Sequence, residues 1–237
     1  MKHSEGGLVT GADRRYFYIT FLREPVSRYL SEWRHVQRGA TWRDAQLRCG
    51  GHAWSEVIPT CYNGSDWSHV SLSDFMSCPH NLASNRQTRM LADLELINCY
   101  NETGADTDQR NKIMLNSAKT NLANMAYFGL TEHQEQSQYL FEETFNLMFK
   151  TDFEQLDHSD THSGHFRDDL DEKIIEEIRN LNHLDIELYK FAQQLLTERF
   201  QSMKEADESF EKHFQDINKE KKFSWEDIED EDYDNGP

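Results

Sequence analysis

The residues with the clearest chemical potential lie in the stretch YFYITFLREPVSRYLSEW, residues 16–33. Arg23 lies near its centre, and Ser31 follows eight positions later. A guanidinium can donate two parallel hydrogen bonds to a phosphate, and a hydroxyl can add a third. Arg34 and Arg38 bring further positive charge a few residues on. These residue types indicate a site for a phosphate or a similar anion.

The same stretch predicts the elements that would hold Arg23. Residues 16–22 are mostly aromatic, β-branched or leucine, which predicts a buried strand. Pro25 predicts the start of a helix that runs to about Arg38, because proline lacks the N–H that is unpaired at this position. At the carboxyl end of a parallel strand, such a helix offers unpaired N–H groups and the positive end of its dipole to an anion.

A spacing of 100° per residue divides this predicted helix into two faces. The apolar face carries Val26, Tyr29, Leu30, Trp33 and Val36. The polar face carries Ser27, Ser31, Arg34, His35 and Arg38. Trp33 is therefore expected in the core. The alternative to an anion site is a basic helix face that only contacts solvent.

Charge is distributed unevenly along the 237 residues, whose net charge is -18. Residues 1–100 carry 11 Lys and Arg against 10 Asp and Glu, whereas residues 101–237 carry 14 against 33. An anion site is therefore expected in the first part. A general binder of nucleic acid or of anionic membranes needs a broad basic surface, so we expect neither partner.

The cysteines and two asparagines bear on the compartment. Four cysteines could form two disulfides in any of three pairings: Cys49, Cys61, Cys78 and Cys99. Asn63 and Asn101 each begin an Asn-X-Ser/Thr glycosylation triplet beside them. Together these features favour a secretory lumen. The alternative is a reduced cytosolic protein with four core cysteines.

Local signals predict further elements along the chain. These are, in order, helices over 71–78, 81–94 and 110–125, a strand over 126–130, a helix over 131–148 and a long helix from about residue 171. Thr131 with Gln134 forms a capping-box signature. Asp185 is a polar interruption in the apolar stripe of the last helix. No run is apolar and long enough for a membrane span.

The stretch DHSDTHSGHF, residues 157–166, contains His158, His162 and His165 at spacings that a zinc site could use. No nearby cysteine or carboxylate pattern supports a closed site, so we predict no metal. Beyond about residue 204 the periodicity fades, and WEDIEDEDYDNGP has the composition of a disordered acidic tail.

Residues 22–33, LREPVSRYLSEW, resemble the segment of PAPS-dependent sulfotransferases that binds the 3′-phosphate of the donor 3′-phosphoadenosine 5′-phosphosulfate (PAPS). Its extension YLSEWRHVQRGATW is similar to the heparan sulfate 6-O-sulfotransferases. Similar segments follow in order: IPTCY (58–62), NLASNRQTRMLADL (81–94), CYN (99–101), AYFGLTE (126–132) and QYLFEETFNLMF (138–149). The resemblance covers about residues 16–200.

The resemblance implies an α/β fold: an incomplete P-loop-like sulfotransferase domain with few parallel strands and many helices. We therefore expect an irregular segment at 1–13, a partial sulfotransferase domain at 14–203, and an acidic helix extension with a disordered tail at 204–237. The implied activity is transfer of a sulfuryl group from PAPS to the 6-hydroxyl of glucosamine residues in heparan sulfate. Family members are anchored in the Golgi membrane and act in its lumen.

The resemblance also implies roles for individual residues. Arg23 and Ser31 would hold the 3′-phosphate, and Thr161 and Ser163 lie in a loop that approaches the nucleotide. Contacts with heparan sulfate would come from Arg34, His35, Arg38, Trp42, Arg86 and Arg89. Trp33 is a further candidate for sugar contact, although its place on the apolar face favours core packing.

The catalytic residues are not assigned. The family's KTGG-like loop, lysine and catalytic histidine precede the opening strand, and KHSEGGLVTG at 2–11 does not match them. We therefore expect a family member without that unit, with little activity alone. The alternatives are a non-catalytic glycan- or nucleotide-binding remnant and a helical adaptor that acts through the acidic tail.

Overall fold

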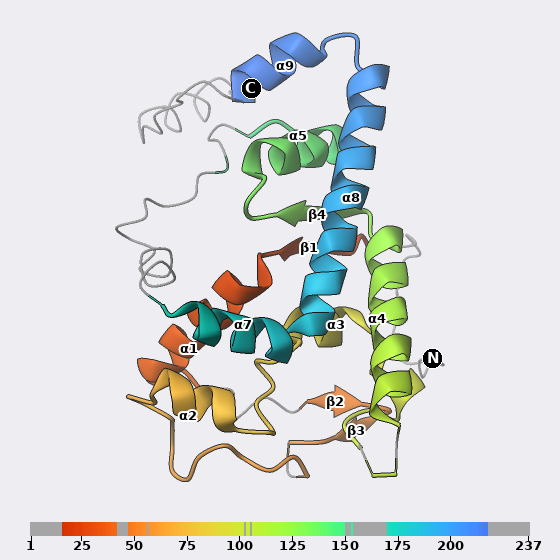
Figure 1. Cartoon of the computed structure of the whole chain (residues 1–237). Helices are drawn as coiled ribbons and strands as arrows, with labels where there is room; N and C mark the ends of the chain where they lie inside the picture. Colours follow the sequence, from red (N-terminus) through yellow and green to blue (C-terminus); the bar gives the residue numbers. More distant parts are fainter. Residues whose placement is uncertain are drawn as a thin grey trace, which may run out of the picture.

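The computed structural model describes residues 16–41, 47–55, 57–101, 103–104, 106–149, 153 and 170–217. Within these ranges, helices surround a short pair of parallel strands (Figure 1). The predicted α/β class with few parallel strands and many helices is confirmed. Several predicted features lie outside the described residues: Trp42, His158, Thr161, His162, Ser163, His165 and the chain after 217.

The parallel pair consists of β1 (Ile19–Leu22) and β4 (Tyr127–Leu130), in a register that sets Leu22 opposite Leu130. Both strands were predicted, but β1 is shorter than residues 16–22. Every residue of β4 is buried, whereas Leu22 is the buried residue of β1. The expectation of a buried strand from residue 16 is wrong: pairing with the four-residue β4 begins at Ile19, and Tyr16, Phe17 and Tyr18 are exposed.

Gly129 of β4 lies opposite Phe21 of β1. A Cβ atom at this position would overlap the ring of Phe21 and the hydroxyl of Tyr127. Glycine therefore permits the two aromatic side chains to fill the space over the strand pair, which is a common role of glycine within a strand.

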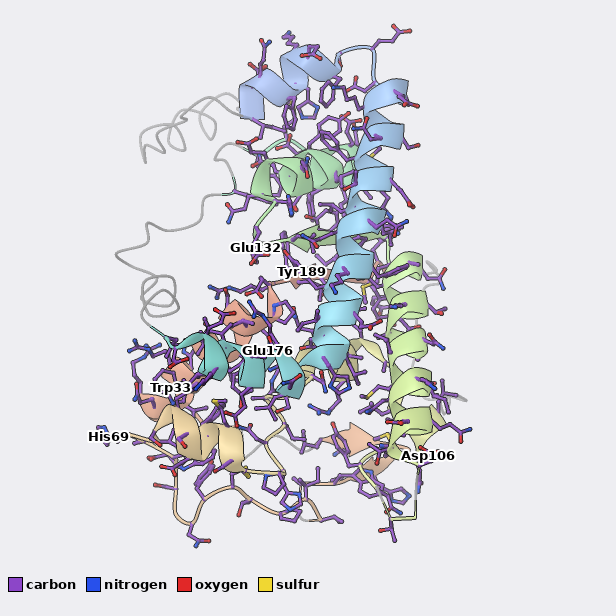
Figure 2. All side chains as sticks on the ribbon, in the orientation of Figure 1. Trp33, His69, Asp106, Glu132, Glu176 and Tyr189 are labelled. Carbon is purple, nitrogen blue, oxygen red and sulfur yellow. A yellow bond between two sulfur atoms is a disulfide. The ribbon has the colours of Figure 1, made fainter. Side chains whose placement is uncertain are left out.

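The helix α1 (Pro25–Gln37) follows β1 and buries the predicted apolar face. Trp33 is 4% exposed, and its indole N–H donates a hydrogen bond to the carbonyl of Val70 at 3.1 Å (Figure 2). Core packing of Trp33 is thus confirmed. Around α1 lies one apolar cluster, the α1 cluster, which includes side chains of α2 (Leu72–Ser77) and α7 (Glu172–Leu181).

A second apolar cluster, the sheet cluster, surrounds β4. It includes Leu22 of β1, Ile97 and side chains of four longer helices: α4 (Thr107–Asn124), α5 (Gln134–Phe145), α8 (His183–Ala206) and α9 (Phe210–Ile217). The long helix α8 runs beside α4 and continues past β4 towards α9 (Figure 1). In α9, Phe210 and Ile217 are buried, so the packed structure continues beyond residue 203.

Three predicted helices differ from the observed ones. The helix predicted over 81–94 is reduced to α3 (Arg86–Leu91), because Asn85 adopts a left-handed conformation, and η1 (Leu94–Ile97) follows. The capping box at Thr131 does not form: the Thr131 N–H donates to the carbonyl of Leu22, and α5 ends at Phe145. The long helix predicted from residue 171 breaks at Asn182 into α7 and α8.

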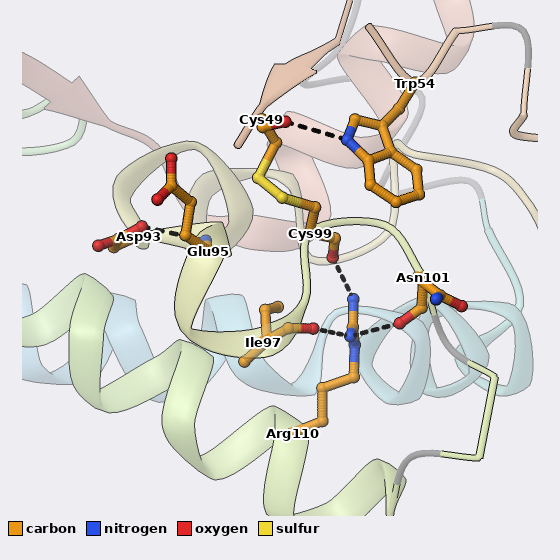
Figure 3. The surroundings of a disulfide bond; sticks show 8 residues. All are labelled: Cys49, Trp54, Asp93, Glu95, Ile97, Cys99, Asn101 and Arg110. Atoms are coloured by element: carbon orange, nitrogen blue, oxygen red, sulfur yellow. Dashed lines mark hydrogen bonds between the residues drawn. A yellow bond between two sulfur atoms is a disulfide. The ribbon is translucent and has the colours of Figure 1, made fainter. Parts of the chain in front are cut away.

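The disulfides are Cys49–Cys99 and Cys61–Cys78, one of the three pairings that the sequence allows. Cys49 lies in a hairpin of β2 (Arg48–Cys49) and β3 (His52–Ala53). Next to this disulfide, the Arg110 guanidinium donates to the carbonyls of Ile97, Cys99 and Asn101 (Figure 3). No helix among the described residues has the length and apolar character needed to cross a bilayer.

Candidate donor-binding site

Arg23 lies directly after β1 and is half-buried. Gln87 is 9% exposed, and its side-chain amide contacts the main-chain N–H and carbonyl of Arg23. Its Oε1 accepts from the Arg23 N–H at 2.8 Å, and its Nε2 donates to the Arg23 carbonyl at 2.9 Å. One residue earlier, the Leu22 carbonyl accepts from the Thr131 N–H at 3.0 Å. The main chain that carries Arg23 is therefore fixed by side-chain and main-chain contacts from α3 and the end of β4.

Glu24 occupies the N-terminus of α1. Its carboxylate accepts from the Val26 N–H at 3.2 Å and from the Ser27 N–H at 2.8 Å, and Pro25 has no N–H to offer. The expectation that these N–H groups are available to an anion is therefore wrong, because a carboxylate of the chain already lies at the positive end of the helix dipole. An anion at Arg23 has to be bound by side chains instead.

Glu132 contacts the main chain of Glu24, between β1 and α1. Its Oε1 accepts from the Glu24 N–H at 3.0 Å, while its Oε2 accepts from the Tyr189 hydroxyl at 2.6 Å (Figure 2). Burial, together with this carboxylate, raises the pKa of Tyr189. The hydroxyl therefore stays protonated near neutral pH and continues to orient Glu132.

The predicted residues on α1 lie along its polar face. Ser31 and Arg34 are half-buried, and His35 and Arg38 are exposed. The guanidinium of Arg34 lies over the ring of Trp33, 5.3 Å from its centroid. Arg38 Nη2 is 3.2 Å from His35 Nδ1. The structure thus brings His35 and Arg38 together near the C-terminal end of α1.

The two predicted arginines of α3 are both engaged within the chain. Arg86 donates to both carboxylate oxygens of Glu32 on α1. Arg89 donates to the carbonyls of Leu82 and Ser84, each at 2.8 Å, and burial lowers the pKa of its guanidinium. Arg89 therefore supports its own loop, whereas an anionic ligand at Arg86 would compete with Glu32.

Asp185 of α8 is fully buried beneath the first turn of α3. Its Oδ1 accepts from the Thr88 N–H and hydroxyl, each at 2.7 Å, and its Oδ2 accepts from the Gln87 N–H at 3.1 Å. Asp185 interrupts the apolar stripe of the helix predicted from residue 171, and this interruption was a signal for its role. Gln87 carried no such signal, because nothing local distinguishes it within NRQTR.

A hollow of about 830 Å³ opens beside the Glu32–Arg86 pair, against α1 and the chain around the Cys61–Cys78 disulfide. Its wall includes Tyr62 and Trp67, whose rings stack with centroids 5.5 Å apart. Aromatic surface beside a few polar groups is typical of a site for a small organic ligand.

Comparison with known proteins matches residues 3–192 to the sulfotransferase family. The chain belongs to the sulfotransferase family. The chain is 50% identical to heparan-sulfate 6-O-sulfotransferase 3-B of Danio rerio, over 84% of this chain and 47% of that protein. It is 52% identical to heparan-sulfate 6-O-sulfotransferase 2 of Gallus gallus (81% and 47%) and to heparan-sulfate 6-O-sulfotransferase 1 of Cricetulus griseus (79% and 46%). The chain spans about half the length of the curated relatives it matches.

Within this sulfotransferase chain, one group of described residues has the donor atoms for a metal ion: Glu143, Asp207 and His213. His213 Nε2 lies 2.6 Å from the buried Glu142 carboxylate, and its Nδ1 lies 3.1 Å from Glu143. These contacts join α9 to α5, so the group has a structural explanation without an ion.

Proposed function

We propose that this sulfotransferase chain binds PAPS through its 3′-phosphate and takes part in sulfuryl transfer to the 6-hydroxyl of glucosamine residues in heparan sulfate. The observation that carries the proposal is the position of Arg23, half-buried at the carboxyl end of a parallel strand on a main chain held by Gln87. The identity with heparan-sulfate 6-O-sulfotransferases supports the choice of substrate.

The chemistry of the Arg23 and Ser31 side chains suits a phosphate, because a guanidinium and a hydroxyl both donate hydrogen bonds to its oxygens. Arg23 and Ser31 are both half-buried, so a bound phosphate would be partly shielded from water, where bonds from a guanidinium gain strength. Because Glu24 takes the helix N–H groups, we assign the phosphate to the Arg23 guanidinium and the Ser31 hydroxyl. Thr161 and Ser163 are further candidates near the nucleotide.

PAPS supplies the activated sulfuryl group in the proposed reaction. The sugar 6-hydroxyl oxygen bonds to sulfur, the bond from sulfur to the 5′-phosphate oxygen breaks, and the hydroxyl proton passes to a base. Arg23 and Ser31 act at the other end of the nucleotide, where they hold the donor in a fixed position. No described residue is assigned as the base, so we expect weak turnover. Donor binding does not need the base and should remain measurable.

We assign the heparan sulfate side to the hollow beside Arg86 and to the basic end of α1. The stacked rings of Tyr62 and Trp67 offer an apolar surface, and His35 and Arg38 offer exposed basic groups for sulfates and carboxylates. The remaining candidates for sugar contacts are Arg34, Trp42 and Arg89. Two disulfides fit an oxidising compartment such as the Golgi lumen, where exposed Asn63 and half-buried Asn101 would be glycosylation sites.

Calorimetry with 3′-phosphoadenosine 5′-phosphate tests the donor assignment. We expect Arg23→Ala to lower the affinity about tenfold or more, because a hydrogen-bonded charge is lost. Arg179→Ala is the control: it removes an arginine of α7 that pairs with Glu172 and Glu176, and it should leave the affinity unchanged. An unchanged affinity in Arg23→Ala would contradict the assignment.

Incubation with PAPS and heparan sulfate, followed by disaccharide analysis, tests the reaction. We expect 6-O-sulfated glucosamine as the product. Sulfate found solely at another position would refute the proposed acceptor. Binding of the nucleotide without any turnover would favour the alternative of a non-catalytic nucleotide-binding protein.

A further inference from the structure

We propose that Gln87 is a positioning residue for the donor: its amide fixes the main chain of Arg23 and thereby aims the guanidinium at the 3′-phosphate. This inference rests on the proposed function, because it takes Arg23 as a ligand of that phosphate. Gln87 itself need not touch the nucleotide.

The contact between Gln87 and Arg23 is a closed pair of hydrogen bonds between residues 64 positions apart. The amide oxygen accepts from the Arg23 N–H at 2.8 Å, and the amide nitrogen donates to the Arg23 carbonyl at 2.9 Å. The side-chain amide thus bonds to the residue after β1 as the main chain of a neighbouring strand would. Because Gln87 is buried, both bonds are shielded from water and hold the Arg23 backbone more firmly than exposed bonds would.

Gln87 can hold Arg23 because its own main chain is fixed. Its N–H and that of Thr88 donate to the buried carboxylate of Asp185. A line of contacts therefore runs from α8 through the first turn of α3 to the end of β1. Each member is buried or half-buried, so little freedom is left along this line.

Fixing the main chain matters because the arginine side chain is long and has several rotatable bonds. Any movement of the Arg23 Cα atom therefore displaces the guanidinium at its end. Leu22 and Glu24, on either side, are already held by Thr131 and Glu132. The Gln87 amide acts on the residue between them. A binding group that moves by about 1 Å loses much of its effect on a bound substrate. A free Arg23 main chain would therefore weaken contact with the 3′-phosphate in particular.

The test compares two nucleotides, 3′-phosphoadenosine 5′-phosphate and adenosine 5′-monophosphate, which differ in the 3′-phosphate. We expect Gln87→Leu to lower the affinity for the first about tenfold and to change the second much less. Arg23→Ala should have the same selective effect. The double variant should bind no more weakly than Arg23→Ala alone, because Gln87 acts through Arg23.

Gln138→Leu is the matched control. Gln138 is also a buried glutamine whose amide accepts from a main-chain N–H, that of Phe153, and donates to a side chain, Glu142. Its loss should lower the melting temperature without changing the ratio of the two affinities. A purely structural role of Gln87 would give the same result in Gln87→Leu.

The outcomes separate the inference from the proposed function. The affinity ratio is the affinity for 3′-phosphoadenosine 5′-phosphate divided by that for adenosine 5′-monophosphate. If Arg23→Ala lowers this ratio and Gln87→Leu does not, the positioning role is overturned and the proposed function is unaffected. No effect of Arg23→Ala, or no preference of the unaltered chain for the 3′-phosphorylated nucleotide, overturns both. If Gln87→Leu does not fold, Gln87→Glu serves instead: it keeps an acceptor for the Arg23 N–H, loses the donor to the carbonyl, and should lower the same ratio.

Discussion

Asn85 and Asp185 exchange hydrogen bonds between two helix ends. The Asn85 amide oxygen accepts from the N–H groups of Leu184 and Asp185 in the first turn of α8. The Asp185 carboxylate in turn accepts from Gln87 and Thr88 in the first turn of α3. Each residue therefore caps the other's helix, as the two partners of a capping box do within one helix. The exchange joins α3 to α8 through polar contacts.

The first prediction concerns the burial of this cap. Asp185→Ala should lower the free energy of unfolding by about 3–5 kcal/mol, because it leaves the buried N–H groups of Gln87 and Thr88 without an acceptor and removes one of the two carboxylates beside the Arg28 guanidinium. Asp106 caps α4 through the N–H groups of Asp108 and Gln109, but it is exposed. Asp106→Ala should therefore cost about 1 kcal/mol.

Urea denaturation of the two variants measures this difference. Both substitutions remove an aspartate that accepts two helix N–H groups, so a larger loss in Asp185→Ala reports the effect of burial and of Arg28. Equal losses would contradict the added effect of burial and of Arg28.

At the scale of elements, the sequence predicted what local signals determine. Pro25 marked the start of α1, Ser71 capped α2, and the apolar spacing of α1 and α4 matched the buried faces. The breaks at Asn85 and Asn182 were not predictable in this way. Asn182 Oδ1 accepts from Arg28 and from the Asn85 N–H, 154 and 97 positions away. These breaks depend on tertiary contacts that no periodicity encodes.

In the candidate site, too, local signals predicted some residues, whereas others depend on tertiary contacts. The positions of Arg23 and Ser31 on a strand end and the following helix were predictable from local pattern. The contacts of Gln87 and Glu24 with that turn were not. Glutamate is not among the preferred N-cap residues. The main chain of Gln87 is held next to Arg23 by Asp185, which is far away in sequence.

The second prediction compares the two disulfides as connections between elements. Cys49–Cys99 closes a loop with a sequence separation of 50, and Cys61–Cys78 one of 17. In the chain-entropy model the longer loop stabilises by about 4 kcal/mol and the shorter by about 3 kcal/mol. Cys49→Ala/Cys99→Ala should therefore lower the free energy of unfolding by more than Cys61→Ala/Cys78→Ala.

Guanidinium denaturation of both double variants under non-reducing conditions measures the two losses. The longer loop also holds the carbonyls of Ile97 and Cys99, which Arg110 contacts, and this adds to the expected difference (Figure 3). A larger loss for Cys61→Ala/Cys78→Ala would show that loop length does not set the order.

At the scale of the whole molecule, the site lies where the two apolar clusters meet. Leu22 belongs to the sheet cluster and Val26 to the α1 cluster, so the chain around Arg23 passes from one to the other. Asn182, between α7 and α8, marks a second passage between the same two clusters. The polar groups of the site therefore lie at the junction of the two clusters. There the main-chain groups of Arg23 and Glu24 bond to side chains, because β1 has already ended.

The third prediction follows from buried tyrosines in both clusters. Burial is the main cause that raises the pKa of four tyrosine hydroxyls: Tyr29, Tyr127, Tyr139 and Tyr189. Below the usual tyrosine pKa of about 10, these hydroxyls are protonated in the folded and the unfolded chain alike, and stability is unaffected. Above it, the unfolded chain loses these protons while the folded chain keeps them. The free energy of unfolding should therefore fall as the pH rises past about 10.

Urea denaturation at a series of pH values from about 8 to 11, followed by tyrosinate absorbance, measures the fall, since these hydroxyls should ionise together with unfolding. Tyr127→Phe removes one of the four hydroxyls, whose partner is the Ser137 carbonyl, and should make the fall with pH less steep. Early ionisation of all tyrosines without unfolding would contradict the prediction. It would mean that water reaches the hydroxyls of both clusters, and the junction that positions Arg23 would then be far less rigid than its contacts indicate.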